Sequence, residues 1–393
     1  MRVIIVIFTF CLQIVAQANT PFLHRSNRLI LDSTEKPIQL RGVNLGGWLM
    51  WEEWIWGGGF HSQTHVMDGL IQMTSKEDAE KFRDSIWLNY ISENDLKKIA
   101  AAHFNVVRVP LNAKIFDETA EPSAYKGVGW KILDSVLTWC KRYGIYAIPD
   151  FHGAPGGQSR YFIADPDKVR LWSSEKDQQR FADLWKAIAM RYKNNSALGG
   201  YDLINEPIQD KKDQLVNMYE KIIAAIREVD QNHMVFIEGG NFAKDFTLFS
   251  KVLDPNMAFS FHFYNWFGGK PKNKLKNYPA LSAKFNVPLW CGEWGENNYG
   301  VLETTRKVME DPANGFSGWC FWTWKKVRNG YATLNEINCG ENWKVLVEAL
   351  KHKGKRKNIS KEFALKAMHE FLKAIRFSNN ATDEVLLKIL SPF

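Results

Sequence analysis

The sequence predicts an α/β fold, a single (β/α)8 TIM barrel with an N-terminal hairpin and a C-terminal helical tail. Two short apolar runs are its first basis, Tyr201-Asp-Leu-Ile-Asn-Glu-Pro207 and Val287-Pro-Leu-Trp-Cys-Gly-Glu-Trp-Gly295. Glycine or proline bounds each run, so each is expected to be a buried strand with a glutamate, Glu206 or Glu293, where it emerges. Similar runs alternate with helical segments along the chain, which is the pattern of a closed parallel barrel.

The first elements precede that alternation. Leu29–Leu31 and Ile38–Leu40 flank a polar turn, and we predict that they form a hairpin below the barrel. The first barrel strand is expected at 41–44, where it meets a glycine turn. The following segment, 48–60, holds four tryptophans, Glu52, Glu53 and three consecutive glycines. Large aromatic residues in a loop are costly to expose, so this segment is expected to be either a cleft wall or an apolar plug packed on the barrel.

The remaining elements follow in order. Strands are predicted at 105–110, 145–152, 201–206, 234–239, 258–264, 287–295 and 318–324, and helices at 92–102, 130–143, 175–193, 212–229, 275–285, 302–310, 342–350 and 361–375. The two-residue period of a strand places Ser260, His262 and Tyr264 on one face, and turns Trp322 and Trp324 to one side.

The two strand-end glutamates point to glycoside hydrolysis. One carboxyl group must protonate the leaving oxygen while another attacks the anomeric carbon, or activates water against it. Only a fold that gathers strand ends can bring Glu206 and Glu293 together, and a β/α barrel gathers them at the carboxyl ends of its strands. The alternative is two unrelated glutamates at a sheet edge. Arg108 and His152 also lie near strand ends and are candidate site residues. The alternative for Arg108 is a structural ion pair.

Seven motifs resemble glycoside hydrolase family five, the cellulase-like retaining glycosidases, and within it the fungal exo-β-1,3-glucanases. They extend from about Leu40 to Trp324 and occur in the order of the family. The motifs are Gly42-Val-Asn-Leu-Gly-Gly-Trp48, Arg108-Val-Pro110, His152-Gly-Ala-Pro-Gly156, Asn205-Glu-Pro207, His262-Phe-Tyr264, Gly292-Glu-Trp294 and Phe321-Trp-Thr-Trp-Lys325.

The resemblance implies a role for each site residue. Glu206 is the implied general acid/base and Glu293 the implied nucleophile. Arg108 and Tyr264 would keep Glu293 ionised and aligned. Of the sugar-binding residues that the resemblance implies, Asn205 would bind the 2-hydroxyl and the others would line or enter the cleft: His152, His262, Trp322, Glu52 and Phe267. A nearby arginine would give the nucleophile a low pKa, and a nearby ionised carboxylate would give the acid a raised one.

Two departures from the glucanase pattern affect the expected substrate. Tyr161-Phe162 stands where that branch has a Phe-Asp pair that blocks one end of the cleft, and Glu53 stands in place of a proline. The expected function is a retaining hydrolase of β-glucosidic bonds in β-glucan or a glucoside, similar to an exo-β-1,3-glucanase. The alternatives are an endo-β-1,4-glucanase or mannanase, a glycolipid-directed β-glucosidase, and a carbohydrate-binding barrel without turnover.

Composition and charge bear on partners and location. The formal net charge is +8, and half of this excess lies in residues 354–393, so no basic stripe typical of nucleic-acid binding is evident elsewhere. Residues 1–18 have the form of a secretory signal, with Arg2, an apolar stretch and Ala16-Gln-Ala18. We therefore expect a secreted or periplasmic barrel over 19–353, a basic helical tail over 354–393, no membrane span and a monomer.

Four cysteines remain after such a signal: Cys140, Cys291, Cys320 and Cys339. They have no metal-binding spacing, and they could be buried thiols or form a disulfide. Because two carboxylates suffice for the reaction, no metal or organic cofactor is expected.

Overall fold

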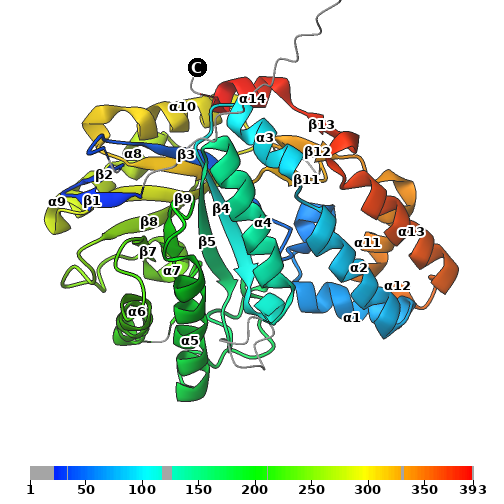
Figure 1. Cartoon of the computed structure of the whole chain (residues 1–393). Coiled ribbons are helices and arrows are strands. Elements are labelled where there is room, and N and C mark those ends of the chain that lie inside the picture. The colour runs from blue at the N-terminus through cyan, green and yellow to red at the C-terminus, as the bar shows by residue number, and fades with distance from the viewer. Residues whose placement is uncertain (1–21, 33, 117–125, 210, 329–331, 392–393) are drawn as a thin grey trace, which may run out of the picture.

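The computed structural model describes residues 22–32, 34–116, 126–209, 211–328 and 332–391. Eight parallel strands close into a barrel with helices around it, so the predicted fold is confirmed (Figure 1). The predicted secretory signal lies outside the described residues. In chain order the barrel strands are β3 (Leu40–Asn44), β4 (Val106–Asn112), β5 (Tyr146–Gly153), β6 (Gly200–Asp202), β7 (Met234–Glu238), β8 (Met257–Tyr264), β9 (Leu289–Gly295) and β10 (Gly318–Phe321).

The barrel strands are buried on both faces. Every residue of β4, β5 and β9 is buried, as expected for strands that face the lumen on one side and helices on the other. Strand β6 is much shorter than the predicted 201–206, because its regular pairing stops at Asp202. Beyond it the chain bends, and Glu206 has a left-handed φ of 42°. Glu206 therefore belongs to the loop above the barrel.

Helices cover the barrel near the predicted positions. Gly144, at φ 68°, ends α4 (Val128–Tyr143) as expected. The predicted helix 275–285 is interrupted, so that its residues belong to two helices. Pro279 lies in the first turn of the second helix and has no N–H to donate to the preceding turn, so the first helix cannot continue into the second. The helices after the third and later strands are α5 (Glu175–Tyr192), α6 (Lys212–Arg227), α7 (Gly240–Ala243), α8 (Pro271–Leu275), α9 (Tyr278–Phe285) and α10 (Tyr299–Glu310), and those before are α3 (Glu93–Ala101) and α4 (Val128–Tyr143).

The N-terminal hairpin exists, and its predicted strand Leu29–Leu31 is confirmed, but the partner strand is not the predicted one. Strand β1 (His24–Ser26) pairs with β2 (Leu29–Leu31), and Asn27 takes a positive φ in the turn. On the predicted side the pairing is limited to an isolated antiparallel bridge between Leu31 and Pro37 and a bond from the Ile38 N–H to the Ile30 carbonyl at 2.9 Å, because Leu40 already belongs to the first barrel strand.

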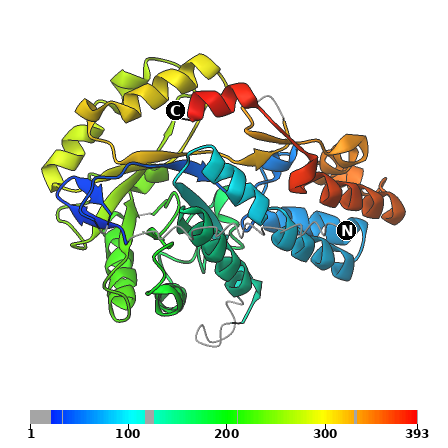
Figure 2. The ribbon, with the colours of Figure 1, turned by 45° about the horizontal axis from the view of Figure 1, so that its top comes forward.

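Two helices that the sequence analysis did not predict follow the first strand, α1 (Gln63–Met73) and α2 (Lys76–Asn89). Ser62 and Ser75 cap them by accepting backbone N–H groups of the first turn. Helices α11 (Gly340–Lys351), α12 (Lys353–Arg356) and α13 (Lys361–Ala374) pack beside α1 and α2 to form a layer outside the barrel (Figures 1 and 2).

The tryptophan-rich segment anchors this layer. Trp48, Trp51 and Trp56 are almost fully buried, so the plug interpretation holds for these three. The indole of Trp343 donates to the carbonyl of Trp56 and stacks on Phe371 at 3.8 Å, which links the segment to α11 and α13. Burial of rings of this size contributes roughly 2–3 kcal/mol each to stability.

The chain beyond the barrel also contains a small sheet of β11 (Lys325–Lys326), β12 (Asn335–Ile337) and β13 (Asn380–Thr382), followed by α14 (Glu384–Leu390), which packs on α10 (Figure 2). The prediction that Trp322 and Trp324 point to one side was wrong. Strand β10 ends at Phe321, and Trp324 turns outward so that its indole donates to Asp95 of α3 at 2.9 Å.

All four cysteines named above are free and buried, which settles the alternatives in favour of thiols. None of the helices within the described ranges is long and apolar enough to cross a bilayer.

Candidate active site

A cavity of about 550 Å³ opens at the carboxyl ends of the barrel strands. Loops after several strands contribute its walls, which is where barrel enzymes carry their catalytic groups. Its lining comprises Glu52, Trp54, Phe60, His152, Phe162, Ile163, Asn205, Glu206, Tyr264, Asn265, Trp266, Glu293, Gly295, Glu296, Asn297, Trp322, Lys326 and Ala332.

The two predicted glutamates lie together in this cavity. A carboxylate oxygen of Glu206, one of Glu293 and a ring nitrogen of His262 all lie within 4.8 Å of one another. Carboxyl groups about 5–5.5 Å apart are typical of retaining glycosidases, whereas inverting enzymes separate them by about 6.5–9.5 Å to admit a water. The spacing therefore fits direct attack by one of the two carboxylates.

Arg108 lies under this pair and is fully buried. Its guanidinium contacts Glu293 at 3.3 Å, Asp202 at 2.8 Å and Glu238 at 2.9 Å. It also contacts Asp150 at 3.0 Å. One positive charge is thus shared by four buried carboxyl groups, and we call the side chains of Arg108, Asp150, Asp202, Glu238 and His262 the cavity floor.

Glu238 ties the floor to Glu206. One of its oxygens accepts the backbone N–H of Glu206 at 2.7 Å, which holds the strained left-handed backbone there. Its other oxygen lies 3.2 Å from Nε2 of His262, while Nδ1 of His262 lies 2.8 Å from Glu206. Burial alone would lower the pKa of His262, but Glu238, Glu293 and Glu206 outweigh it and hold that pKa well above its usual value. The surrounding carboxyl groups therefore favour the protonated, imidazolium form of His262.

Glu293 is aligned by two donors. The Tyr264 hydroxyl donates to it at 2.5 Å, and Arg108 contacts its other oxygen. The predicted low pKa of Glu293 was nevertheless wrong. Burial raises its pKa and the charge of Glu206 adds to this, whereas His262 and Arg108 oppose it. Arg108 cannot dominate because its charge is divided among the carboxyl groups of the floor.

The other sugar-binding candidates at or just beyond the ends of the barrel strands are also brought together. Asn205 accepts from Arg108 at 2.9 Å, which orients its amide above the floor. The rings of His152 and Trp322 stack at 5.4 Å with planes 9° apart. Burial, with a smaller contribution from Arg108, lowers the pKa of His152 to about 3, so the ring is neutral and can both donate and accept hydrogen bonds.

Glu52 lines the cavity and is 4% exposed. It accepts from the indole of Trp54 at 2.7 Å. Burial raises its pKa to about 8, with additions from Glu293 and Glu206. Glu52 is therefore a neutral acid at pH 7, able to donate a hydrogen bond to a ligand.

Phe267 does not line the cavity. Its side chain is 96% exposed, and the neighbouring Trp266 lines the cavity instead, stacked on Tyr264 at 4.7 Å. The residue that stands for the blocking aspartate, Phe162, also lines the cavity, with its ring 5.7 Å from that of Phe60. We call Trp54, Phe60, Phe162 and Trp266 the cavity mouth; for Trp54 the cleft-wall interpretation therefore holds.

Three carboxyl groups of the floor and one lysine were not predicted from the sequence. Glu238 ends an apolar run in the same way as Glu206 and Glu293, so the signal was present. Asp150 and Asp202 lie within their strands, where a carboxylate gave no separate signal. Lys326 lines the cavity above the indole of Trp54 at 5.0 Å, and burial, with a smaller contribution from Arg328, lowers its pKa to about 7.

Two groups outside the pair of Glu206 and Glu293 could be considered for a metal. The carboxylates of Asp150, Asp202 and Glu238 converge, but Arg108 already occupies the space between them as the counter-charge.

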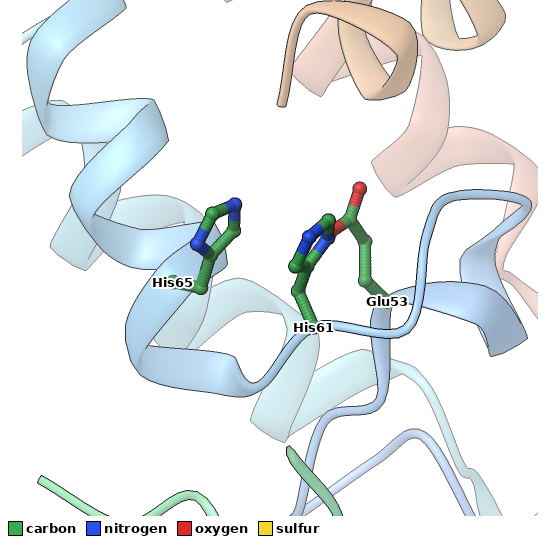
Figure 3. A group of neighbouring side chains, drawn as sticks. All are labelled: Glu53, His61 and His65. Carbon is green, nitrogen blue, oxygen red and sulfur yellow. The ribbon is translucent and has the colours of Figure 1, made fainter. Parts of the chain in front are cut away.

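The second group lies behind the cavity, where Glu53 is buried against His61, at 2.6 Å, and near His65 (Figure 3). The two imidazole rings stack face to face at 4.1 Å with planes 12° apart, so their in-plane lone pairs do not converge on one point. Arg356 also donates to His65 at 2.9 Å. We interpret the group as an ion-paired connection to the outer helices.

Comparison with known proteins places these observations in a family. The profile described as Cellulase (glycosyl hydrolase family 5) matches residues 31–328. A protein named beta-xylosidase from Phanerodontia chrysosporium is 32% identical over 252 residues, which are 63% of this chain and 52% of that protein. The chain therefore spans about half the length of that relative.

Two further similarities extend over a larger share of the matched protein. A glucan 1,3-beta-glucosidase of Pichia angusta is 27% identical, with 80% of this chain and 87% of that protein covered. The crystal structure of a rutinosidase from Aspergillus niger superposes with a TM-score of 0.59 at 20% identity, over 74% of this chain and 91% of the other, which supports the fold.

Proposed function

We propose, from the premise that the chain belongs to the Cellulase family (glycosyl hydrolase family 5), that it hydrolyses β-glucosidic bonds with retention of configuration. The observation that carries this proposal is the approach of Glu206 and Glu293 to within 4.8 Å. The names of the relatives, a beta-xylosidase and glucan 1,3-beta-glucosidases among them, agree with a β-glycoside as substrate.

In the first step Glu293 attacks the anomeric carbon while Glu206 gives its proton to the departing oxygen. The bond from the anomeric carbon to the aglycone breaks as the bond to Glu293 forms. Tyr264 and Arg108 both donate to Glu293, so they favour its ionised, attacking form even though burial opposes ionisation.

In the second step a water attacks the anomeric carbon and gives a proton to the carboxylate of Glu206. The bond to Glu293 breaks, and two inversions leave the β configuration. The imidazolium of His262 contacts Glu206 at 2.8 Å, so it stabilises that residue when it is ionised. General acid–base catalysis of this kind contributes about 10²–10⁴-fold to the rate.

The substrate that we favour is a β-glucan or glucoside cleaved in the manner of an exo-β-1,3-glucanase. The neutral Glu52 and the stacked Trp322 are suited to hold a terminal sugar, because one offers a hydrogen bond and the other a flat apolar face. One observation favours the alternatives. The apolar Phe162 lines the cavity where the glucanase branch has its blocking aspartate, and an open end of this kind suits an endo-β-1,4-glucanase or mannanase, or a β-glucosidase for glycolipids.

Two measurements test the reaction and its substrate. Proton NMR of an aryl β-glucoside hydrolysis should show the β anomer released first, and release of the α anomer would reject direct attack by Glu293. Products from laminarin, cellulose, mannan and a glucosylated lipid would define linkage and mode of cleavage. A carbohydrate-binding barrel without turnover would release no phenol from the aryl glucoside.

We also propose that the protein is exported and acts as a monomer without nucleic acid. The support for export is the signal-like segment 1–18, and a mature protein beginning at Asn19 in the culture medium would agree with it. Retention of residues 1–18 in the secreted or cell-bound protein would contradict it.

A further inference from the structure

The loop between β8 and α8 carries an unusual pair of side chains. Trp266 is 64% exposed and Phe267 is 96% exposed. Within the described ranges, the exposed large apolar side chains that are aromatic are Phe60, Tyr161, Trp266 and Phe267. Phe60 and Trp266 line the cavity, so exposed aromatic surface is concentrated around its opening. Exposed apolar groups that cluster in this way mark a surface that meets another phase or partner.

The loop is built to present this pair. The N–H of Gly268 donates to the carbonyl of Asn265, and the side chain of Asn265 donates to Gly269, both at 2.9 Å. Gly268 has a φ of 68° and open space around it, while the Asn265 N–H is anchored to Glu296 at 2.6 Å. The turn therefore projects Phe267 into solvent from a fixed base.

A strong positive charge follows the pair directly. Residues Lys270, Lys272, Lys274 and Lys276 are exposed, whereas Pro271 and Leu275 between them are buried. The sequence has no acidic residue between Asp254 and Glu293, and Glu296 is the carboxylate in contact with the loop base. We call residues 266–276 the aromatic–lysine loop.

We propose that the aromatic–lysine loop docks the protein on a lipid bilayer that carries anionic headgroups. Tryptophan and phenylalanine favour the interface of a bilayer, and each lysine near an anionic surface contributes about 1 kcal/mol. A neutral glucan could stack on Trp266 and Phe267, but it would gain nothing from four lysines. The charge therefore favours an anionic lipid surface over a neutral polysaccharide.

Docking through this loop places the opening of the cavity at the bilayer, because Trp266 belongs to both surfaces. A glucoside whose sugar projects from the lipid would then reach Glu206 and Glu293 directly. This consequence rests on the proposed function, whereas docking itself does not.

The test is sedimentation of the full protein with vesicles of phosphatidylcholine, with and without phosphatidylserine. We expect the wild type to bind only the phosphatidylserine vesicles. Phe267→Ser and the quadruple change of Lys270, Lys272, Lys274 and Lys276 to Gln should each weaken binding by about tenfold or more. Each variant should keep the wild-type melting temperature, since these side chains are exposed.

Matched controls change similar residues elsewhere. Val385→Ser alters an exposed apolar residue of α14. A second quadruple variant changes exposed lysines of the basic tail, Lys353, Lys355, Lys357 and Lys361, to Gln. Both controls should bind vesicles as the wild type does.

Several outcomes would overturn the proposal. Equal binding to both vesicle types, or loss of binding in the tail variant instead, would place the contact elsewhere. If binding needs the lysines but not Phe267, the loop is attracted to any anionic surface and does not dock on a bilayer as proposed. Loss of binding to insoluble glucan alone in Phe267→Ser would assign the loop to polysaccharide. The loop-lysine variant should hydrolyse a soluble aryl β-glucoside at the wild-type rate; absence of hydrolysis in every protein would count against the proposed function and leave docking intact.

Discussion

The floor and the mouth of the cavity are built on opposite principles. On the floor, Arg108, Asp202, Glu238 and His262 have no exposed surface, and each touches at least one partner of opposite charge. At the mouth, Phe60 and Trp266 expose more than half of their side chains. Glu206 and Glu293 are thus held by buried charge, whereas the surface around the opening of the cavity is apolar and exposed.

This contrast indicates how the two regions should respond to substitution. Removal of one member of a buried charge network leaves the others without compensation and typically costs about 3–5 kcal/mol. Substitution of an exposed side chain usually changes stability by less than about 0.5 kcal/mol. Floor variants should therefore lose turnover or stability, and mouth variants should lose affinity for substrate.

The largest effect is expected for Glu293→Gln. The amide cannot form the covalent bond, so hydrolysis of an aryl β-glucoside should fall below detection. Circular dichroism should show a folded protein, because Gln is nearly the same size as Glu and fills the same space beside Tyr264 and Arg108. Wild-type turnover in this variant would reject Glu293 as the attacking group.

Glu206→Ala should lower kcat by about 10²–10⁴-fold on a substrate with a poor leaving group. Azide should restore part of the activity on a substrate with a good leaving group, because departure then needs no acid and azide replaces water in the second step. Failure of azide to restore any activity would count against Glu206 as the acid/base.

Glu238→Gln tests the link between floor and acid/base. The loss of a charge-assisted hydrogen bond is worth about 1.5–3 kcal/mol, so kcat should fall about ten- to a hundredfold. Without the Glu238 charge, the pKa of His262 should fall toward its usual value, which NMR titration of the imidazole would measure. An unchanged His262 titration and pH profile would show that Glu238 only fills space.

Glu52→Gln should change how the stability of the protein depends on pH. The pKa of Glu52 is about 8 in the folded protein, above the 4.5 of an unfolded chain. The wild type therefore loses stability relative to the variant as pH rises from 4.5 to 8, by roughly 4–5 kcal/mol. Melting temperatures of the two proteins should converge below pH 4.5 and diverge above it; parallel curves would contradict a buried neutral acid.

The smallest effect is expected at the mouth. Phe60→Ser should raise the KM for an aryl β-glucoside a few-fold while kcat and melting temperature stay unchanged. A large fall in kcat for this variant would remove the distinction between mouth and floor.

The strand-end residues of the cavity could be predicted from sequence because they obey a rule of position. An apolar run that ends in a polar residue marks a strand end, and a closed barrel collects strand ends, which placed Arg108, His152, Asn205 and Glu293 in one cavity. Asp150 and Asp202 were missed because they interrupt their runs without ending them. Their role becomes visible only when the barrel closes around Arg108.

The mouth could not be predicted in the same way. Loop residues have no fixed period, so the sequence did not distinguish Trp266, which lines the cavity, from Phe267, which points away. Trp324 was misplaced for a related reason, since the strand period was extended beyond Phe321, where β10 ends. Helices α1 and α2 were not predicted although Ser62 and Ser75 stand at their caps, because they lie in the long stretch between the first two barrel strands, outside the alternation of strand and helix.

The most direct test of the account is to trap the reaction halfway. A 2-deoxy-2-fluoro-β-glucoside with a good leaving group should inactivate the enzyme, and mass spectrometry of its peptides should find one fluoroglucosyl group on Glu293. A label on another residue, or release of product without any labelled enzyme, would contradict attack by Glu293 beside Glu206.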